Sequence, residues 1–166
     1  ANVDAALRAR LLAAATAAAR SVAYRNAGTV EFLVDKYRNI YFLEMNTRIQ
    51  VEHPVTEWVY GVDLVQAQIR IAAGEPMWIR QEDVVARGHA IEARIYAEDP
   101  DKGFLPATGQ LIHLATPAES AQVRIDTGVE QGDSISPFYD PMIAKLIVWG
   151  ENRAAALQQL DAALAQ

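Results

Sequence analysis

The 166 residues include no cysteine, which excludes disulfide bonds and any metal site built on thiolates. No apolar run is long enough to cross a bilayer and no signal-peptide pattern is visible, so no membrane role is expected. Basic residues are also scarce: 15 lysines and arginines stand against 21 acidic residues, giving a net charge of -6. That balance argues against a nucleic-acid partner, which would select a basic chain. We expect a setting in the bacterial cytoplasm or, in a eukaryote, the mitochondrial matrix.

The composition that remains is typical of a soluble globular protein, with 51% hydrophobic and 22% charged residues. The length suits one ordinary domain or parts of two. The chain starts at Ala1, without a methionine, and enters a predicted helix at once. We therefore expect a segment of a longer protein.

The first half of the sequence predicts a helix, a β-hairpin and a second helix. Alanine-rich sequence from Asp4 to about Ala23 favours a helix. Alternating β-branched and aromatic residues predict strands over 29–34 and 40–46, joined by a polar turn at 35–39. Pro54 is expected to break the extended pattern, and an amphipathic helix is predicted over 61–73.

The second half begins near Val84 and is mainly β. Strands are predicted over 89–96, 110–115, 122–126 and 142–149, with a turn-rich loop between the first two. A final alanine-rich helix is predicted over 151–165. The sequence therefore predicts an α+β fold in two domains, residues 1–83 and 84–166.

Polar side chains alternate along the end of the second hairpin strand and beyond it. They are Glu44, Asn46, Arg48, Gln50 and Glu52. Because a strand sends alternate side chains to one face, these residues share a side for as long as the extended geometry lasts. A packed core would not hold such a row, since each buried charge needs a partner. The row therefore indicates a polar site.

A pair of carboxylates in the hairpin indicates a metal. Glu31 on the first strand would face Glu44 on the second, with Asn46 two residues further on. Neighbouring carboxylates repel each other unless a cation lies between them. Mg²⁺ needs only one or two protein carboxylates, because it also keeps waters and binds substrate phosphates. A metal–nucleotide site and an ordinary solvated hairpin face explain this pattern equally well.

Two arginines are candidate anion ligands, because a guanidinium can bind a planar oxyanion through two hydrogen bonds. Arg48 follows the carboxylate pair, and its alternative role is a salt bridge to Glu44 or Glu52. Glu52 is a candidate general base, or simply the partner of an arginine. Arg94, in the strand predicted over 89–96, is the second candidate, and its alternative is an ordinary ion-paired residue.

Residues 44–57, EMNTRIQVEHPVTE, resemble the signature of biotin carboxylases. Segments at 28–33, 61–64, 87–100, 104–106 and 139–147 agree with the same family and come in its order. The resemblance covers essentially the whole chain. It is closest to the α subunits of biotin-dependent acyl-CoA carboxylases, the 3-methylcrotonyl-CoA type among them.

The resemblance implies the C-terminal part of an ATP-grasp fold, followed by a biotin carboxylase C-terminal domain with a mainly antiparallel sheet. It implies an ATP-dependent ligase that carboxylates biotin on a carrier protein with bicarbonate, through carboxyphosphate, within an acyl-CoA carboxylase. The implied cofactors are ATP, Mg²⁺ or Mn²⁺, and carrier-bound biotin. The implied partners are bicarbonate, a biotin carboxyl carrier domain, a carboxyltransferase subunit and a second copy bound through the C-terminal domain.

The family's motifs also imply a role for each matching residue. The metal ligands would be Glu31, Glu44 and Asn46, and the ATP contacts would be Glu31, Leu33 and Glu44. The contacts to bicarbonate or biotin would be Arg48, Gln50, Val51 and Arg94. The catalytic residues would be Arg48, Glu52 and Arg94. Glu52 would deprotonate bicarbonate, and Arg94 would stabilise the biotin enolate.

Two other interpretations stay open. The three metal candidates fit another ATP-grasp carboxylate–amine ligase equally well, and the second domain fits a non-catalytic dimerisation or assembly module. The chain also departs from the family, because it has no glycine-rich lid loop and no biotin-carrier motif, and its lysines match no ATP-binding position. We therefore expect this chain alone to be inactive or nearly so, since phosphoryl transfer rests on positioning and charge neutralisation.

Overall fold

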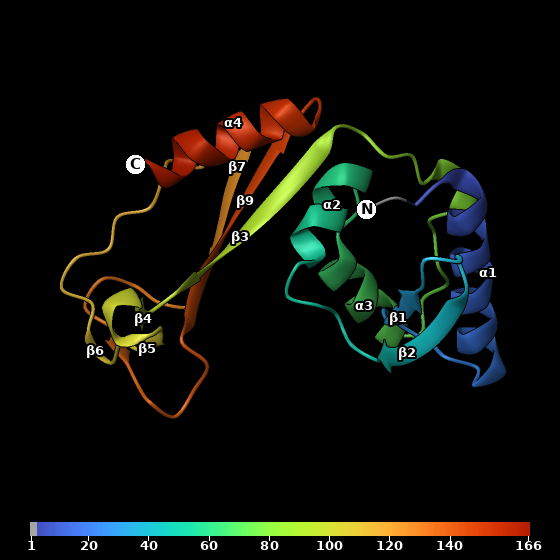
Figure 1. Ribbon diagram of the computed structural model, residues 1–166, viewed down its shortest axis with the longest axis horizontal. Helices are drawn as coiled ribbons and strands as arrows, with labels where there is room; N and C mark the ends of the chain where they lie inside the picture. Colours follow the sequence, from blue (N-terminus) through green and yellow to red (C-terminus); the bar gives the residue numbers. More distant parts are fainter. Residues whose placement is uncertain (1–2) are drawn as a thin grey trace. The chain divides into compact units, whose positions relative to one another are not determined.

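The computed structural model describes residues 3–166, which form two compact units. The first unit contains the chain up to His53 together with Asp63–Asp83. The second contains Pro54–Val62 and Val84–Gln166. Figure 1 labels the elements of both units.

Helix α1 (Ala5–Ser21) opens the first unit. Its alanine-rich sequence has a high helix propensity, and the Asp4 side chain caps its first turn by accepting from the Leu7 N–H at 2.9 Å. Arg20 lies in the last turn, where a positive charge interacts favourably with the helix dipole. Leu7 is the buried residue of this helix.

Strands β1 (Thr29–Val34) and β2 (Ile40–Asn46) form the antiparallel hairpin that the alternation predicts, with the same bounds. Asp35 holds the turn, because its carboxylate accepts from the side chain and the backbone N–H of Asn39 and from the N–H of Tyr37. The Asn39 side chain, followed by these backbone donors, lowers the pKa of Asp35. Phe32 and Phe42 pack edge to face, with ring centroids 6.3 Å apart.

Helix α3 (Leu64–Ala72) completes the first unit with the short 3₁₀ helix η1 (Gln81–Asp83). Asp63 caps α3 by accepting from the N–H of Gln66. The guanidinium of Arg70 lies 3.7 Å from the ring centroid of Trp78 and is also paired with Glu75 at 2.6 Å. These contacts hold the segment after α3 against the helix.

The second unit is built on a three-stranded antiparallel sheet in the order β3–β9–β7. The strands are β3 (His89–Tyr96), β9 (Met142–Gly150) and β7 (Val123–Thr127). Helix α4 (Arg153–Leu164), capped by Asn152, runs along one face of this sheet (Figure 1). Val123, Leu146, Val148 and Ala163 form the buried core between helix and sheet.

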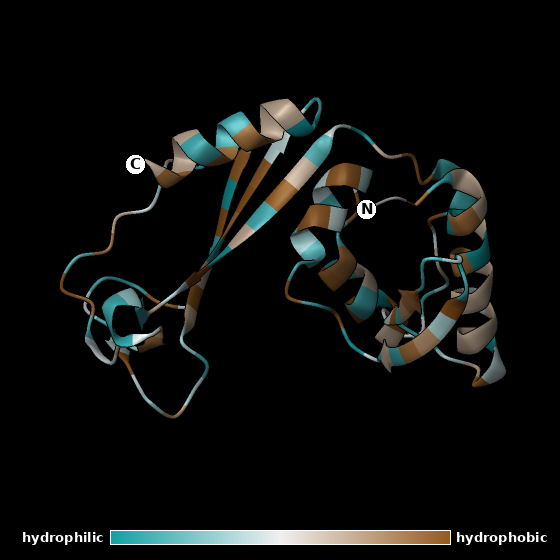
Figure 2. Ribbon diagram, in the orientation of Figure 1, coloured by the Kyte–Doolittle hydropathy of each residue, from teal (hydrophilic) through white to brown (hydrophobic). Residues whose placement is uncertain are grey.

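The alternation of apolar and polar residues decides which face of the sheet is covered. Figure 2 shows it as bands of contrasting hydropathy along β3. Ile91 and Ala93 of β3 pack against the core under α4. Glu92 and Arg94 alternate with them and so point to the opposite face. Helix α2 (His53–Tyr60) is tied to that face by the ion pair between Glu57 and Arg124 of β7.

Short elements complete the second unit. β4 (Glu98–Asp99) pairs with β5 (Leu105–Pro106), and the 3₁₀ helix η2 (Pro100–Lys102) lies between them. β6 (Gly109–Gln110) pairs with β8 (Ser134–Ile135). Among residues 3–166, no helix is both long and apolar enough to cross a membrane.

The structure corrects two of the predicted elements and adds a helix. The helix predicted to begin at Gly61 begins at Leu64, and α2 was not predicted. Pro54 lies outside any strand, as predicted, and stands in the first turn of α2, where proline is tolerated because no intrahelical hydrogen bond is lost. Gly61 instead ends α2: it has φ +67° and its N–H donates to the carbonyl of Glu57 at 2.8 Å.

The strand predicted over 110–115 is also wrong for most of its length. Only β6 (Gly109–Gln110) pairs there, with β8, which was not predicted. Leu111 continues the contact, since its N–H donates to Asp133 at 2.8 Å and its carbonyl accepts from Gly132. Ile112 is 85% exposed, so the apolar residues of this stretch have no covering layer that would fix them as a strand.

Candidate metal and anion site

The register of the hairpin places the two predicted carboxylates directly opposite each other. Glu31 of β1 pairs with Glu44 of β2, and Thr29 pairs with Asn46. Because paired positions share a face, Glu31, Glu44 and Asn46 lie on one side of the hairpin. A β-bulge shifts the register between Glu31 and Phe32, so Leu43 has no directly paired residue on β1.

Asn46 joins the two carboxylates. Its Nδ2 donates to Glu31 Oε1 at 2.8 Å and to Glu44 Oε1 at 3.3 Å. Its Oδ1 accepts from Arg48 Nη2 at 3.2 Å. The three residues that the sequence predicted as metal ligands therefore meet in one hydrogen-bonded group.

This donor set fits a hard divalent cation. Two carboxylates directly opposite each other on paired strands destabilise the hairpin unless a positive group lies near them. No group of three or more His, Cys, Asp or Glu side chains suited to a metal occurs in the described part of the chain. Two carboxylates and one amide oxygen are, however, enough for Mg²⁺ or Mn²⁺ when phosphates supply further oxygens.

Arg48 lies next to this group and keeps its charge available. Its Nη1 donates to the carbonyl of Ile49 at 3.1 Å, and its Nη2 donates to Asn46. Both acceptors are neutral, and the side chain is exposed. A guanidinium in this position can bind an anion beside the carboxylate pair.

In the structure, the row of alternating polar residues keeps its extended geometry over a shorter stretch than the sequence predicted. Extended geometry stops at Asn46, the last residue of β2, so the later residues do not continue the strand face. Gln50 is half-buried, and its carbonyl lies 2.8 Å from His53 Nδ1 and accepts from the His53 N–H. Glu52 is exposed in the turn before α2, and Val51 is half-buried.

Apolar surface lies on the same hairpin. Leu33 shares the Glu31 face of β1 and is 59% exposed. Leu43, the bulged residue, is 53% exposed, and Tyr41, which pairs with Leu33, is 52% exposed. From the sequence, only Leu33 was expected to contact a ligand. The exposed positions of Leu43 and Tyr41 beside it were not predicted, because a bulge changes which side chains share a face and leaves no clear signal in the alternation.

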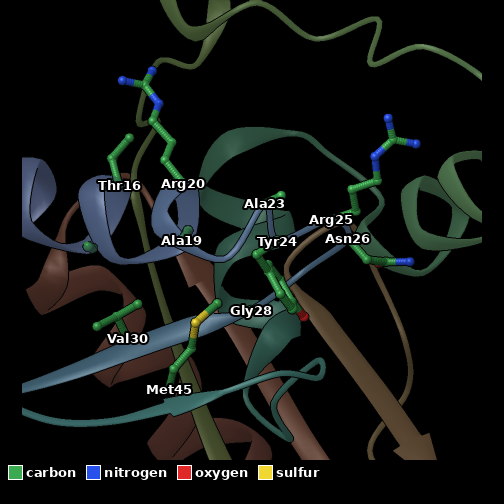
Figure 3. Close-up of a pocket in the computed structure, with 11 residues that line it drawn as sticks. Thr16, Ala19, Arg20, Ala23, Tyr24, Arg25, Asn26, Gly28, Val30 and Met45 are labelled. Carbon is green, nitrogen blue, oxygen red and sulfur yellow. The ribbon is translucent and has the colours of Figure 1, made fainter.

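A cavity in the first unit lies on the other side of the hairpin. Its volume is about 600 Å³, and it is bounded by α1 and the hairpin. Val30 and Met45, which alternate with Glu31 and Glu44, contribute to its floor, and Arg20 and Arg25 extend away from them (Figure 3). The cavity therefore contains none of the predicted site residues.

Arg94 lies in the second unit on a row of charges that crosses the sheet. Arg94 of β3 pairs with Lys145 of β9, which pairs with Asp126 of β7. Lys145 Nζ lies 3.3 Å from Asp126 Oδ2. Arg124, two residues earlier, binds Asp126 through Nε and Nη2 at 2.7 and 2.9 Å, and Glu57 through Nη1 at 2.8 Å.

Strong pairing sets the charge state of this row. The hydrogen bond to Asp126 raises the pKa of Arg124 well above its ordinary value. Burial raises the pKa of Asp126, but the hydrogen bond and charge of Arg124, with the charge of Lys145, outweigh burial and leave the pKa below the ordinary value. The sequence did not predict this network, because its members lie 67 residues apart and no local pattern joins them.

Comparison with known proteins assigns both halves of the chain. Residues 92–166 match the biotin carboxylase C-terminal domain, and residues 1–80 match the ATP binding domain of the carbamoyl-phosphate synthase L chain. The α subunit of rat mitochondrial methylcrotonoyl-CoA carboxylase is 56% identical over 165 residues, which is 99% of this chain and 23% of the rat protein. The chain belongs to the biotin carboxylase family.

Further relatives agree with this biotin carboxylase assignment. The α subunit of mitochondrial methylcrotonoyl-CoA carboxylase from Arabidopsis thaliana is 60% identical over 160 residues, 96% of this chain and 22% of that protein. The biotin carboxylase domain dimer of Hydrogenobacter thermophilus 2-oxoglutarate carboxylase, in complex with MgADP, ADP and bicarbonate, superposes with a TM-score of 0.92 and 44% identity. That match covers 99% of this chain and 36% of the other. The chain thus spans about a quarter of the length of the curated relatives it matches.

Proposed function

We propose that this biotin carboxylase chain carries the metal, bicarbonate and enolate-binding residues for the ATP-dependent carboxylation of carrier-bound biotin in an acyl-CoA carboxylase. The observation that carries the proposal is the group formed by Glu31, Glu44 and Asn46, with Arg48 bound to the same amide. The identity to methylcrotonoyl-CoA carboxylase α subunits supports that acyl-CoA class.

The hairpin holds the metal and the nucleotide phosphates. Glu31, Glu44 and the amide oxygen of Asn46 are the protein ligands of Mg²⁺ or Mn²⁺, which neutralises phosphate charge and orients the γ-phosphoryl group when bound. Leu33 offers exposed apolar surface on the same face, suited to contact with the adenine ring of ATP.

The segment after β2 holds bicarbonate. Arg48 clamps the planar anion through two N–H donors, and Gln50 and the backbone of Val51 help to orient it. Glu52, exposed in its turn, takes the proton of bicarbonate so that an oxygen of the anion can attack the γ-phosphoryl group. The bond between the γ-phosphorus and the β–γ bridging oxygen breaks, ADP leaves, and carboxyphosphate forms. Carboxyphosphate then releases CO₂ and phosphate.

Arg94 serves the second half of the reaction. Phosphate removes the proton from the biotin ureido nitrogen, and negative charge develops on the ureido oxygen. A guanidinium hydrogen-bonded to that oxygen stabilises the enolate and lowers the barrier to attack on CO₂. Arg94 is exposed on the sheet face opposite the α4 core, where a ligand can reach it.

The proposal extends to domains, partners and location. Residues 1–83 are the C-terminal portion of the ATP-grasp domain, and residues 84–166 belong to the biotin carboxylase C-terminal domain. The partners are a biotin carboxyl carrier domain, a carboxyltransferase subunit and a second copy docked through the C-terminal domain. The location is the bacterial cytoplasm or the mitochondrial matrix; the rat and plant relatives are named as mitochondrial proteins.

The test is an assay of the full-length protein for ATP cleavage that depends on both bicarbonate and free biotin. Glu31→Gln is expected to weaken Mn²⁺–ATP binding, because one of two carboxylate ligands is lost. Glu151→Gln, which changes an exposed glutamate before α4, is the matched control and should leave binding unchanged. ATP cleavage that needs neither biotin nor bicarbonate would overturn the proposal in favour of another ATP-grasp ligase.

A further inference from the structure

Asn46 stands between the two parts of the proposed site and is bound to both. Its amide nitrogen faces the carboxylates of Glu31 and Glu44, and its oxygen faces Arg48. The network fixes this orientation, because a carboxylate accepts only from the nitrogen and a guanidinium donates only to the oxygen. In this arrangement the amide is oriented for hydrogen bonding and not for metal coordination.

A cation between the carboxylates requires the reverse orientation. An amide coordinates Mg²⁺ or Mn²⁺ through its oxygen, since its nitrogen has no lone pair to offer and carries two hydrogens. The same carboxylate oxygens cannot keep the amide hydrogens and accept the cation along the same direction. Asn46 must therefore turn its oxygen toward Glu31 and Glu44 when it ligates the metal.

That turn changes the partner of Arg48. The Nη2 of Arg48, now 3.2 Å from the Asn46 oxygen, would then meet the amide N–H groups. Two donors facing each other cannot hydrogen-bond, so Arg48 loses one of its two neutral acceptors. The other acceptor, the carbonyl of Ile49, lies at the next residue in the chain and remains.

We propose that Asn46 is a positioning residue that couples the metal to the anion clamp: binding of the divalent cation turns the Asn46 amide and releases Arg48 for bicarbonate. This inference rests on the proposed function and adds an order to it. By linkage the effect is reciprocal, so bicarbonate bound to Arg48 favours the Asn46 orientation that holds the metal. Until the cation that comes with the nucleotide is in place, one of the five N–H donors of Arg48 is thereby directed at Asn46.

The coupling is measured as binding, with no need for turnover. The dissociation constant of Mn²⁺ for the full-length protein with ADP is determined by electron paramagnetic resonance, with and without saturating bicarbonate. Bicarbonate is expected to tighten Mn²⁺ binding about fivefold or more, within the usual range of allosteric coupling. The direct attraction between a cation and a nearby anion contributes to this ratio, so variants are needed to separate the two causes.

Asn46→Asp separates them. A carboxylate has oxygens on both sides, so it coordinates the cation and accepts from Arg48 without turning. We expect this variant to retain Mn²⁺ binding. The ratio of its Mn²⁺ dissociation constants without and with bicarbonate should fall to less than about half of the wild-type ratio. Asn46→Ala removes the acceptor of Arg48 altogether and is expected to lose the same share of the coupling. Thr47→Ala, at the exposed residue between Asn46 and Arg48, is the control and should keep the full ratio.

The outcomes distinguish this inference from the function on which it rests. If both Asn46 variants bind Mn²⁺ and keep the wild-type ratio, Asn46 does not couple the two ligands, while the metal site stands. If Glu31→Gln and Glu44→Gln leave Mn²⁺ binding unchanged, the metal site itself is wrong and the coupling falls with it. A wild-type ratio near one also contradicts the coupling.

Discussion

Glu57 of α2 and Arg124 of β7 form an ion pair at 2.8 Å, although 67 residues separate them in sequence. Glu57 is buried, with 8% of its surface exposed, and the remaining donors of Arg124 bind Asp126. The pair fixes α2 to the sheet face that also carries Arg94. The buried glutamate of the helix and the half-buried arginine of the neighbouring sheet thus hold the two elements together.

Glu57→Ala is expected to lower the free energy of unfolding by about 1–3 kcal/mol, because the change leaves a partly buried donor of Arg124 without its acceptor. Arg124 keeps its two bonds to Asp126, which limits the loss. Glu82→Ala is the control, since Glu82 and Arg80 form an ion pair in which both side chains are about two-thirds exposed. Denaturant unfolding measures both variants, and equal losses would show that the buried pair adds nothing.

The ion pairing of Asp126 is expected to make the free energy of unfolding depend on pH. Its folded pKa lies below the ordinary value of 3.8, so its stabilising contribution is present above that value and is lost as pH falls through the folded pKa. Asp126→Asn should therefore be less stable than wild type at neutral pH. The difference should shrink as pH falls below about 4. Unfolding midpoints across this range test the sign, and a gap that widens in acid would refute the pairing.

Gly88 is predicted to tolerate no side chain. Its φ is +65°, and an added Cβ would lie 2.4 Å from Trp149 Cζ2 and 2.5 Å from the Gly150 carbonyl oxygen. Gly88→Ala should lose about 2–5 kcal/mol of stability from backbone strain and crowding together. Gly61→Ala isolates the strain, because Gly61 has φ +67° and open space around it, and should lose about 1–2 kcal/mol. Thermal unfolding measures the loss of stability in both variants. The loss in Gly88→Ala minus the loss in Gly61→Ala gives the contribution of crowding.

Arg48→Ala is expected to reduce carboxylation of biotin by the full-length protein about 10²–10³-fold, as for loss of a donor that stabilises charge in the transition state. Mg²⁺–ATP affinity should change much less, because Arg48 binds the anion and not the nucleotide in our proposal. Arg80→Ala removes an exposed arginine outside the site and serves as the control. Comparable losses of ATP affinity and of turnover would show that Arg48 contacts the nucleotide.

The sequence by itself determined the hairpin and its carboxylate pair. Alternation of β-branched and aromatic residues predicted both strands with their bounds, and the expected pairing of Glu31 with Glu44 agrees with the observed register, although only the bulge at Leu43 brings the two residues opposite each other. The signature from Glu44 to Glu57 gave the family, which the comparisons confirm. The roles of all the predicted site residues, the three metal ligands and Arg48 included, stay predictions.

The tertiary structure alone decided the rest, because long-range contacts and special backbone positions leave no local pattern. Helix α2 forms in spite of Pro54 because it begins there and its one buried carboxylate meets Arg124. The bulge at Leu43 and the row from Glu57 to Lys145 join residues that sequence spacing cannot relate. The orientation of the Asn46 amide depends on three side chains at once, and only their positions in space fix which atom faces the two carboxylates and which faces Arg48.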